Sequence, residues 1–159
     1  MAQHRTKFLA SSKEIECEPN TRICYEYLNQ FFMVWSSLEV YCALFGLTLE
    51  KFFEECSNES IHYATELTRK FDRPINDKYL LGDHLLSFSE ADNPNLIYSF
   101  LKGDNTYFMF YCRHIRNMYV HGELSARPNG VKAKKFSFFL QALTSFFIRE
   151  IKANFSRKS

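Results

Sequence analysis

The residue types that can do the most chemistry in this chain gather in one short segment, RHIRNMYVHG, at positions 113–122. A histidine such as His121 can take up and return a proton near neutral pH, because the ordinary pKa of its side chain is about 6.5. Arg116 stays charged and offers a planar fork of donors to a phosphate group, and Asn117 can orient His121 or donate to that phosphate. The segment therefore predicts chemistry on a phosphate group with proton transfer.

The spacing of these residues restricts how they can cooperate. Arg113, Asn117 and His121 are four positions apart and share one ridge of a helix. Arg116 and His121 are five positions apart, so their side chains point about 140° from each other on an ideal helix. Two arrangements bring them to one site: the helix unwinds before Gly122, or a second subunit completes the groove across a two-fold axis.

Apolar periodicity predicts the helices that must position this segment. A stripe of large apolar residues from Tyr107 to Met118 marks one helix that begins at Asp104-Asn105 and stops at Gly122. Similar stripes and cap signals predict further helices at 21–47, 48–56, 57–71, 79–88, 93–103 and 132–155. The polar, aperiodic residues 1–20 are predicted to be a flexible N-terminal arm, followed by a single helical domain over 21–159.

The composition agrees with a compact helical protein. The chain has 159 residues, 46% of them hydrophobic and 17% aromatic, which excludes a disordered chain. Only 5 Gly and 4 Pro leave too few turn residues for a many-stranded β protein. We therefore predict an all-α fold, an up-and-down helical bundle of four to six helices.

The cysteines and the apolar stretches indicate the compartment. Five cysteines without a C-x-x-C pair, and no signal peptide at the N-terminus, predict reduced thiols and a cytoplasmic protein. The longest mostly apolar stretch, 31–47, is interrupted by polar residues and is shorter than the roughly 20 residues that span a bilayer, so no membrane partner is expected.

The sequence R116-N117-x-x-x-H121-G122 before the final helix resembles the R-x(4–6)-H motif of HEPN domains (higher eukaryotes and prokaryotes nucleotide-binding). The helical order of 21–155 agrees with that family, although only the short motif is specific. The resemblance implies a metal-independent endoribonuclease without a cofactor, in which two copies form one site and the ribose 2′-OH attacks the adjacent phosphate. RNA is then the substrate, because DNA lacks that hydroxyl. The expected role is a toxin or defence effector, with an inhibitory antitoxin-like protein as a further partner.

Other charged residues are candidates for binding the substrate. Glu39 is the only charged residue between Phe31 and Leu47, so a buried position would require a partner such as Arg116 or Arg113. The resemblance also implies an acidic residue on an early helix near the motif. Between 113 and 135 the chain carries six Lys or Arg and one acid. Arg113, Lys132, Lys134 and Lys135 are therefore expected to contact RNA phosphates.

Two alternatives stay open. The first is a non-catalytic HEPN-like module that binds a nucleotide, an RNA or a protein through the same groove. Glu123 favours it, because family members paired with nucleotidyltransferase antitoxins carry a tyrosine at that position. The second is a purely structural bundle, in which Arg116 forms a surface ion pair and His121 hydrogen-bonds the last carbonyls of its helix.

Overall fold

The computed structural model of the protein describes residues 18–87 and 95–159. This part of the chain consists of seven α-helices and two 3-10 turns, without a β-strand. They are α2 (Pro19–Phe45), α3 (Leu49–Glu55), α4 (Asn58–Phe71), α5 (Leu80–Ser87), α6 (Asn95–Leu101), η1 (Asn105–Tyr107), α7 (Phe108–Val120), η2 (Pro128–Gly130) and α8 (Ala133–Lys158). The all-α class is confirmed. The seven α-helices correspond to the seven segments predicted as helices, one more than the upper limit of the predicted bundle of four to six.

Several predicted helix boundaries are confirmed by their caps. The Thr48 side chain accepts a hydrogen bond from the Lys51 amide at 3.1 Å, and the Ser57 side chain accepts one from the Ser60 amide at 3.2 Å. Gly46 ends α2 with a φ of 63°, a left-handed conformation that favours glycine. These capping signals involve residues close together in the sequence, so they could be predicted without knowledge of the fold.

Other boundaries differ from the prediction or lie outside the described residues. Pro19 is at the start of α2, where its fixed φ suits a first helical turn, so the helix begins inside the segment predicted as an arm over 1–20. The remainder of that arm, 1–17, lies outside the described residues, as do Phe88 and the predicted Asn93-Pro94 helix start. The motif helix begins with the 3-10 turn η1, capped by Asp104, before α7 continues it.

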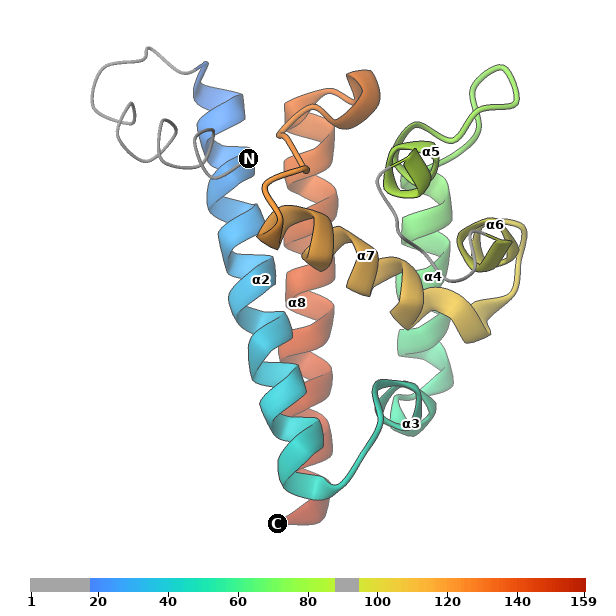
Figure 1. The fold of residues 1–159 in the computed structure, drawn as a ribbon. Helices are drawn as coiled ribbons and strands as arrows, with labels where there is room; N and C mark the ends of the chain where they lie inside the picture. Colours follow the sequence, from blue (N-terminus) through green and yellow to red (C-terminus); the bar gives the residue numbers. More distant parts are fainter. Residues whose placement is uncertain (1–17, 88–94) are drawn as a thin grey trace.

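The arrangement is not the simple up-and-down bundle that we predicted. Helices α2 and α8 lie side by side and run in the same direction, since Phe31 packs on Phe147 and Phe45 packs on Phe155 further along both helices (Figure 1). Helix α4 runs antiparallel to α8, while α3, α5 and α6 lie crosswise and α7 crosses the bundle obliquely (Figure 1). Helices of 7 or 8 residues are too short to follow the long axis and instead cover the side of the bundle.

The motif helix α7 is anchored in the core through a buried carboxylate. Asp72, which follows α4 and is 2% exposed, accepts hydrogen bonds from the Leu81 and Gly82 amides at 3.0 and 2.7 Å and from the Tyr111 hydroxyl at 2.8 Å. Burial raises the pKa of Asp72 above its ordinary value, and these hydrogen bonds oppose the rise. One side chain therefore joins the end of α4 to the start of α5 and to α7.

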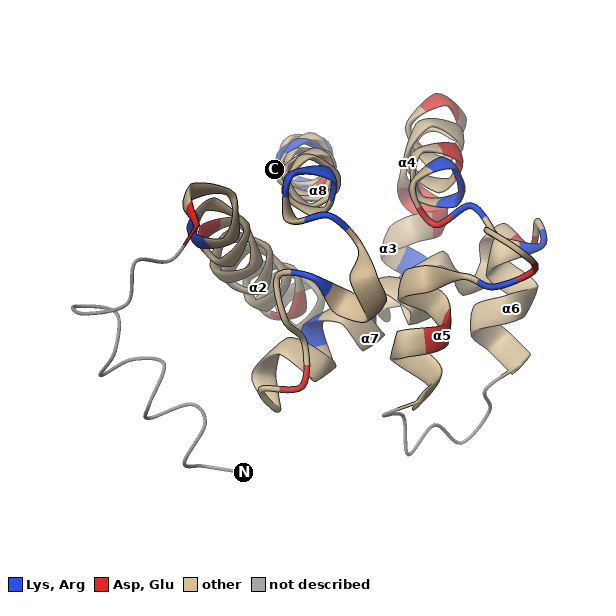
Figure 2. Ribbon diagram, turned by 90° about the horizontal axis from the view of Figure 1, so that it is seen from above, with Lys and Arg blue, Asp and Glu red and all other residues tan. Residues whose placement is uncertain are grey.

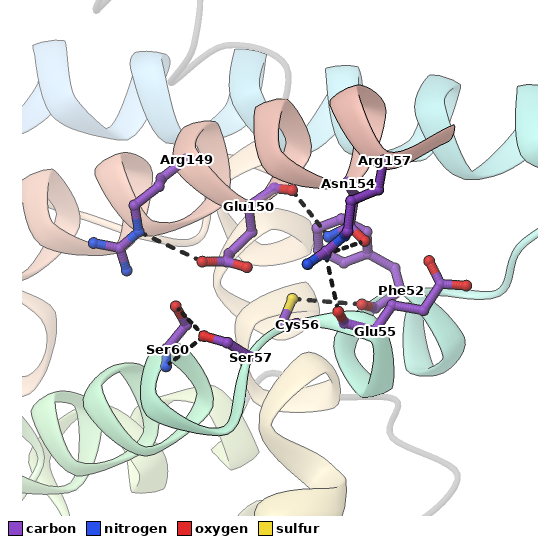
Figure 3. A network of polar contacts seen from close by, with 9 residues as sticks. All are labelled: Phe52, Glu55, Cys56, Ser57, Ser60, Arg149, Glu150, Asn154 and Arg157. Carbon is purple, nitrogen blue, oxygen red and sulfur yellow. Dashed lines mark hydrogen bonds and ion pairs between the residues drawn. The ribbon is translucent and has the colours of Figure 1, made fainter. Parts of the chain in front are cut away.

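A second polar network fixes α3 against α8 (Figure 3). Arg157 donates to the Glu55 carbonyl at 3.0 Å and to the Asn154 amide oxygen at 2.7 Å. Glu150, 4% exposed, pairs with Arg149 at 3.4 Å. Arg157 thus joins the end of α3 to α8, and the buried Glu150 is paired within α8 itself, as expected of a buried polar side chain.

The described cysteines are Cys24, Cys42, Cys56 and Cys112, and all four are free and buried. Burial raises the pKa of the Cys24 thiol to about 12 and that of Cys42 to about 11, so these thiols are poor nucleophiles. Within the described part of the chain, no single helix has the length and apolar character needed to cross a membrane, and α2 with α3 meet that test only together across a 90° bend.

Candidate active site

Arg116 lies on the face of α7 that packs against α2. Its Nη2 donates to Glu39 Oε2 at 3.1 Å, and its guanidinium carbon lies 5.8 Å from the centre of the Phe32 ring. The Arg116 side chain is 26% exposed and that of Glu39 is 40% exposed, so the pair is at the edge of the core and partly in solvent. Of the two partners predicted for Glu39, the fold selects Arg116.

Trp35 supports Glu39 from the core side. Its indole Nε1 donates to Glu39 Oε1 at 3.0 Å, and the indole is fully buried against Phe31 and Phe147. Both carboxylate oxygens of Glu39 are therefore engaged, one by a neutral donor and one by Arg116. Sequence reasoning missed Trp35 and Phe32, although Trp35 and Glu39 stand four positions apart on one helix and that spacing was available as a signal.

Asn117 orients Arg116 rather than His121. Its side-chain oxygen accepts a hydrogen bond from Arg116 Nη1 at 3.0 Å. Its backbone carbonyl accepts the amide of His121, also at 3.0 Å. Arg116, Asn117 and Glu39 thus form one connected group of contacts.

His121 stays in helical geometry, so α7 does not unwind to bring it toward Arg116. Its φ and ψ are −78° and 0°, and Gly122 follows with a φ of 72°. Unwinding before Gly122 was one of the two arrangements that could have joined Arg116 and His121 in a single copy. The structure therefore keeps these two side chains pointing in different directions, about 140° apart by helical geometry.

Backbone amides satisfy the end of α7 and leave the His121 imidazole available. Gly122 donates to the Tyr119 carbonyl at 3.0 Å, and Glu123 donates to the Met118 carbonyl at 2.9 Å. This double contact is the usual glycine-terminated cap of a helix. The exposed His121 side chain has no hydrogen bond to any described residue, so it does not cap its own helix. The alternative of a purely structural bundle predicted such a cap.

The neighbouring polar residues of α7 face other partners. Arg113 pairs with Glu50 of α3 at 3.5 Å, and its side chain is 38% exposed. The His114 ring packs on Phe110 and contacts the Phe110 carbonyl at 3.0 Å. Burial lowers the pKa of His114 below its ordinary value of 6.5. His114 is therefore partly a packing residue, whereas the charged side chain of Arg113 is partly exposed to solvent.

The three lysines at the start of α8 do not act as one group. Lys135 donates to the Phe71 carbonyl at 3.0 Å and lies over the Phe71 ring, so it satisfies the end of α4. Lys132 and Lys134 instead line a hollow of about 360 Å³ together with Arg127, which pairs with Glu18. Figure 2 shows basic positions on α7, on the following loop and at the start of α8. No hydrogen bond or ion pair within the described ranges joins the lysines to Arg116.

The residues described offer no group of three or more His, Cys, Asp or Glu side chains arranged to hold a metal ion. Comparison with known proteins gave no match: no protein-family model, no curated protein and no solved structure is similar to this chain.

Proposed function

We propose that this protein is a metal-independent endoribonuclease of the HEPN type, acting as a homodimer. The observation that carries the proposal is the arrangement on α7. Arg116 is held by Glu39 and Asn117, while the imidazole of His121 is exposed and released from capping at the end of the same helix. A phosphate-binding group and a proton-transfer group are thus built on one rigid element.

The directions of the two side chains support a site made by two copies. In one copy Arg116 points toward α2 and His121 points to solvent, so they do not meet on one phosphate. A two-fold axis beside α7 would place the His121 of each copy near the Arg116 of the other. Residues of both subunits then contribute to a single cleft.

The chemistry at such a site follows from the residue types. His121 takes the proton of a ribose 2′-OH as its oxygen forms a bond to the adjacent phosphorus, and the bond to the 5′ oxygen breaks. The protonated imidazole of His121 then returns the proton to the leaving 5′ oxygen, and a 2′,3′-cyclic phosphate remains on the other fragment. Arg116 stabilises the negative charge that builds up on the phosphate oxygens. A toxin or defence effector restrained by an inhibitory protein is the biological role we propose for this activity.

The test is cleavage of a mixed-sequence RNA in EDTA, with analysis of the fragment ends. Wild-type protein should leave 2′,3′-cyclic phosphate ends, and both His121→Ala and Arg116→Ala should lose cleavage while remaining folded dimers by light scattering. His62→Ala is the matched control, because His62 is an exposed histidine on α4, away from the motif. Cleavage retained by His121→Ala, or abolished by EDTA, would refute the proposal.

A second candidate function is a non-catalytic module that binds RNA or a nucleotide. One observation favours it: the charge of Arg116 is already balanced by Glu39, and in a single copy the guanidinium and the imidazole do not converge. This candidate predicts RNA binding that weakens in Arg116→Ala, with no fragments formed by any variant.

A further inference from the structure

Arg116 is held in place by a chain of contacts that begins in the core. The buried indole of Trp35 donates to one oxygen of Glu39 at 3.0 Å, and Arg116 donates to the other at 3.1 Å. Because the indole is fully enclosed, it cannot follow the carboxylate outward. Glu39 is therefore fixed at the position where it neutralises Arg116.

The rest of the guanidinium is also turned inward. Nη1 donates to the Asn117 side chain at 3.0 Å, and Nε is buried without a hydrogen-bond partner among the described residues. A phosphate is bound most strongly by two parallel N–H groups of an arginine. In the conformation observed, the parallel pair formed by Nε and Nη2 is not offered to a phosphate, because Nε is buried and Nη2 donates to Glu39. A buried N–H without a partner is unfavourable, so an outward movement of the Arg116 side chain would also let Nε form a hydrogen bond with solvent.

We propose that Glu39, held by Trp35, is a latch that competes with RNA phosphate for Arg116. The latch regulates the site of the proposed function and rests on it, because it assigns Arg116 to phosphate binding. In the resting state the Glu39 carboxylate occupies Nη2 and repels an incoming phosphate, which carries charge of the same sign. RNA binding has to separate the ion pair, and this requirement lowers the affinity of the resting protein for RNA.

The first experiment measures binding without cleavage. Its probe is a fluorescein-labelled RNA with 2′-O-methyl groups at every ribose, followed by fluorescence anisotropy. We expect Glu39→Gln to bind about fivefold more tightly than wild type, the factor that corresponds to a partly exposed ion pair.

Glu26→Gln is the matched control. It removes the same charge from the same helix α2 and releases Arg22, whose nitrogen lies 3.6 Å from Glu26 and to which no RNA contact is assigned. Its affinity should stay within about twofold of wild type, the change expected from one exposed surface pair. An equal gain in both variants would show a general charge effect and would overturn the latch, as would unchanged or weaker binding by Glu39→Gln.

The second experiment needs no variant. Trp35 is the only tryptophan in the chain, and its emission responds to the charge beside the indole, which changes when Arg116 leaves the Glu39 carboxylate without its cationic partner. Titrating wild type with the same RNA should change the emission, with a midpoint equal to the dissociation constant from anisotropy. Constant emission at saturating RNA would overturn the latch.

Neither measurement uses cleavage, so the two proposals fail in different ways. A latch that fails these tests leaves His121-dependent cleavage standing. Conversely, absence of cleavage refutes the ribonuclease proposal, whereas the affinities of Glu39→Gln and Glu26→Gln still decide the latch. RNA that binds none of the three proteins overturns both proposals.

Discussion

The hydroxyl of Tyr111 should contribute substantially to stability, because it is the contact through which α7 reaches Asp72. In Tyr111→Phe the ring remains in its fully buried position and only the donor to the carboxylate is lost. A hydrogen bond to a charged, buried acceptor is worth about 2 kcal/mol, and Asp72 keeps its two amide donors. For a chain of this size that loss lowers the melting temperature by about 6 °C.

The assay is urea unfolding followed by Trp35 emission at a fixed protein concentration, because an associated protein unfolds in a concentration-dependent way. The midpoint should fall while the slope stays the same. Tyr63→Phe is the control, since Tyr63 is 49% exposed on α4 and its loss should cost less than about 0.5 kcal/mol. A Tyr111→Phe protein as stable as this control would refute the reasoning that Asp72 anchors the motif helix.

The pH dependence of this penalty gives a further check. Burial raises the pKa of folded Asp72 above its ordinary 3.8, so the folded state holds the proton more tightly than the unfolded chain. The contribution of Asp72 to stability is then greatest below pH 3.8 and falls as the pH rises. As folded Asp72 becomes protonated on acidification, its bond to Tyr111 weakens. The difference between wild type and Tyr111→Phe should therefore narrow in acid.

Four further predictions concern stability and binding. Burial lowers the pKa of His114 and His84 below 6.5, so the unfolded chain binds more protons in acid than the folded protein does. The midpoint of urea unfolding should therefore fall as the pH drops below 6.5, and it should fall less steeply in His114→Gln. Lys135→Met removes the donor to the Phe71 carbonyl and should cost about 1 kcal/mol in urea unfolding, while leaving the affinity for RNA unchanged. Lys134→Met, at the exposed hollow, should instead weaken RNA binding with little effect on stability; the reverse pattern would contradict the assignment of these lysines. Phe147→Ala removes a buried ring that contacts Phe31, Trp35 and Phe108, and thermal unfolding should show a loss of about 4 kcal/mol, whereas a loss below about 1 kcal/mol would contradict its place in the core.

The position of Glu39 shows what could be predicted from the sequence and what depended on the fold. A single carboxylate in a long apolar stretch predicted a cationic partner, because an unpaired charge at the edge of a core is costly. Two arginines of α7 were candidates, and only the packing of α7 against α2 selected Arg116 and left Arg113 to Glu50. The contact of Trp35 with Glu39 also depends on which rotamers the core permits.

Signals that act over three or four residues were readable from the sequence: the apolar stripes, the caps at Thr48 and Ser57, and the glycine ends of α2 and α7. They determined the helical class and the location of the motif at the end of one helix. The tertiary structure decided the parallel pairing of α2 with α8, the oblique course of α7 and the use of Lys135 at the end of α4. Those features depend on contacts between residues far apart in the chain, where side-chain shape and burial, rather than local backbone preference, set the free energy.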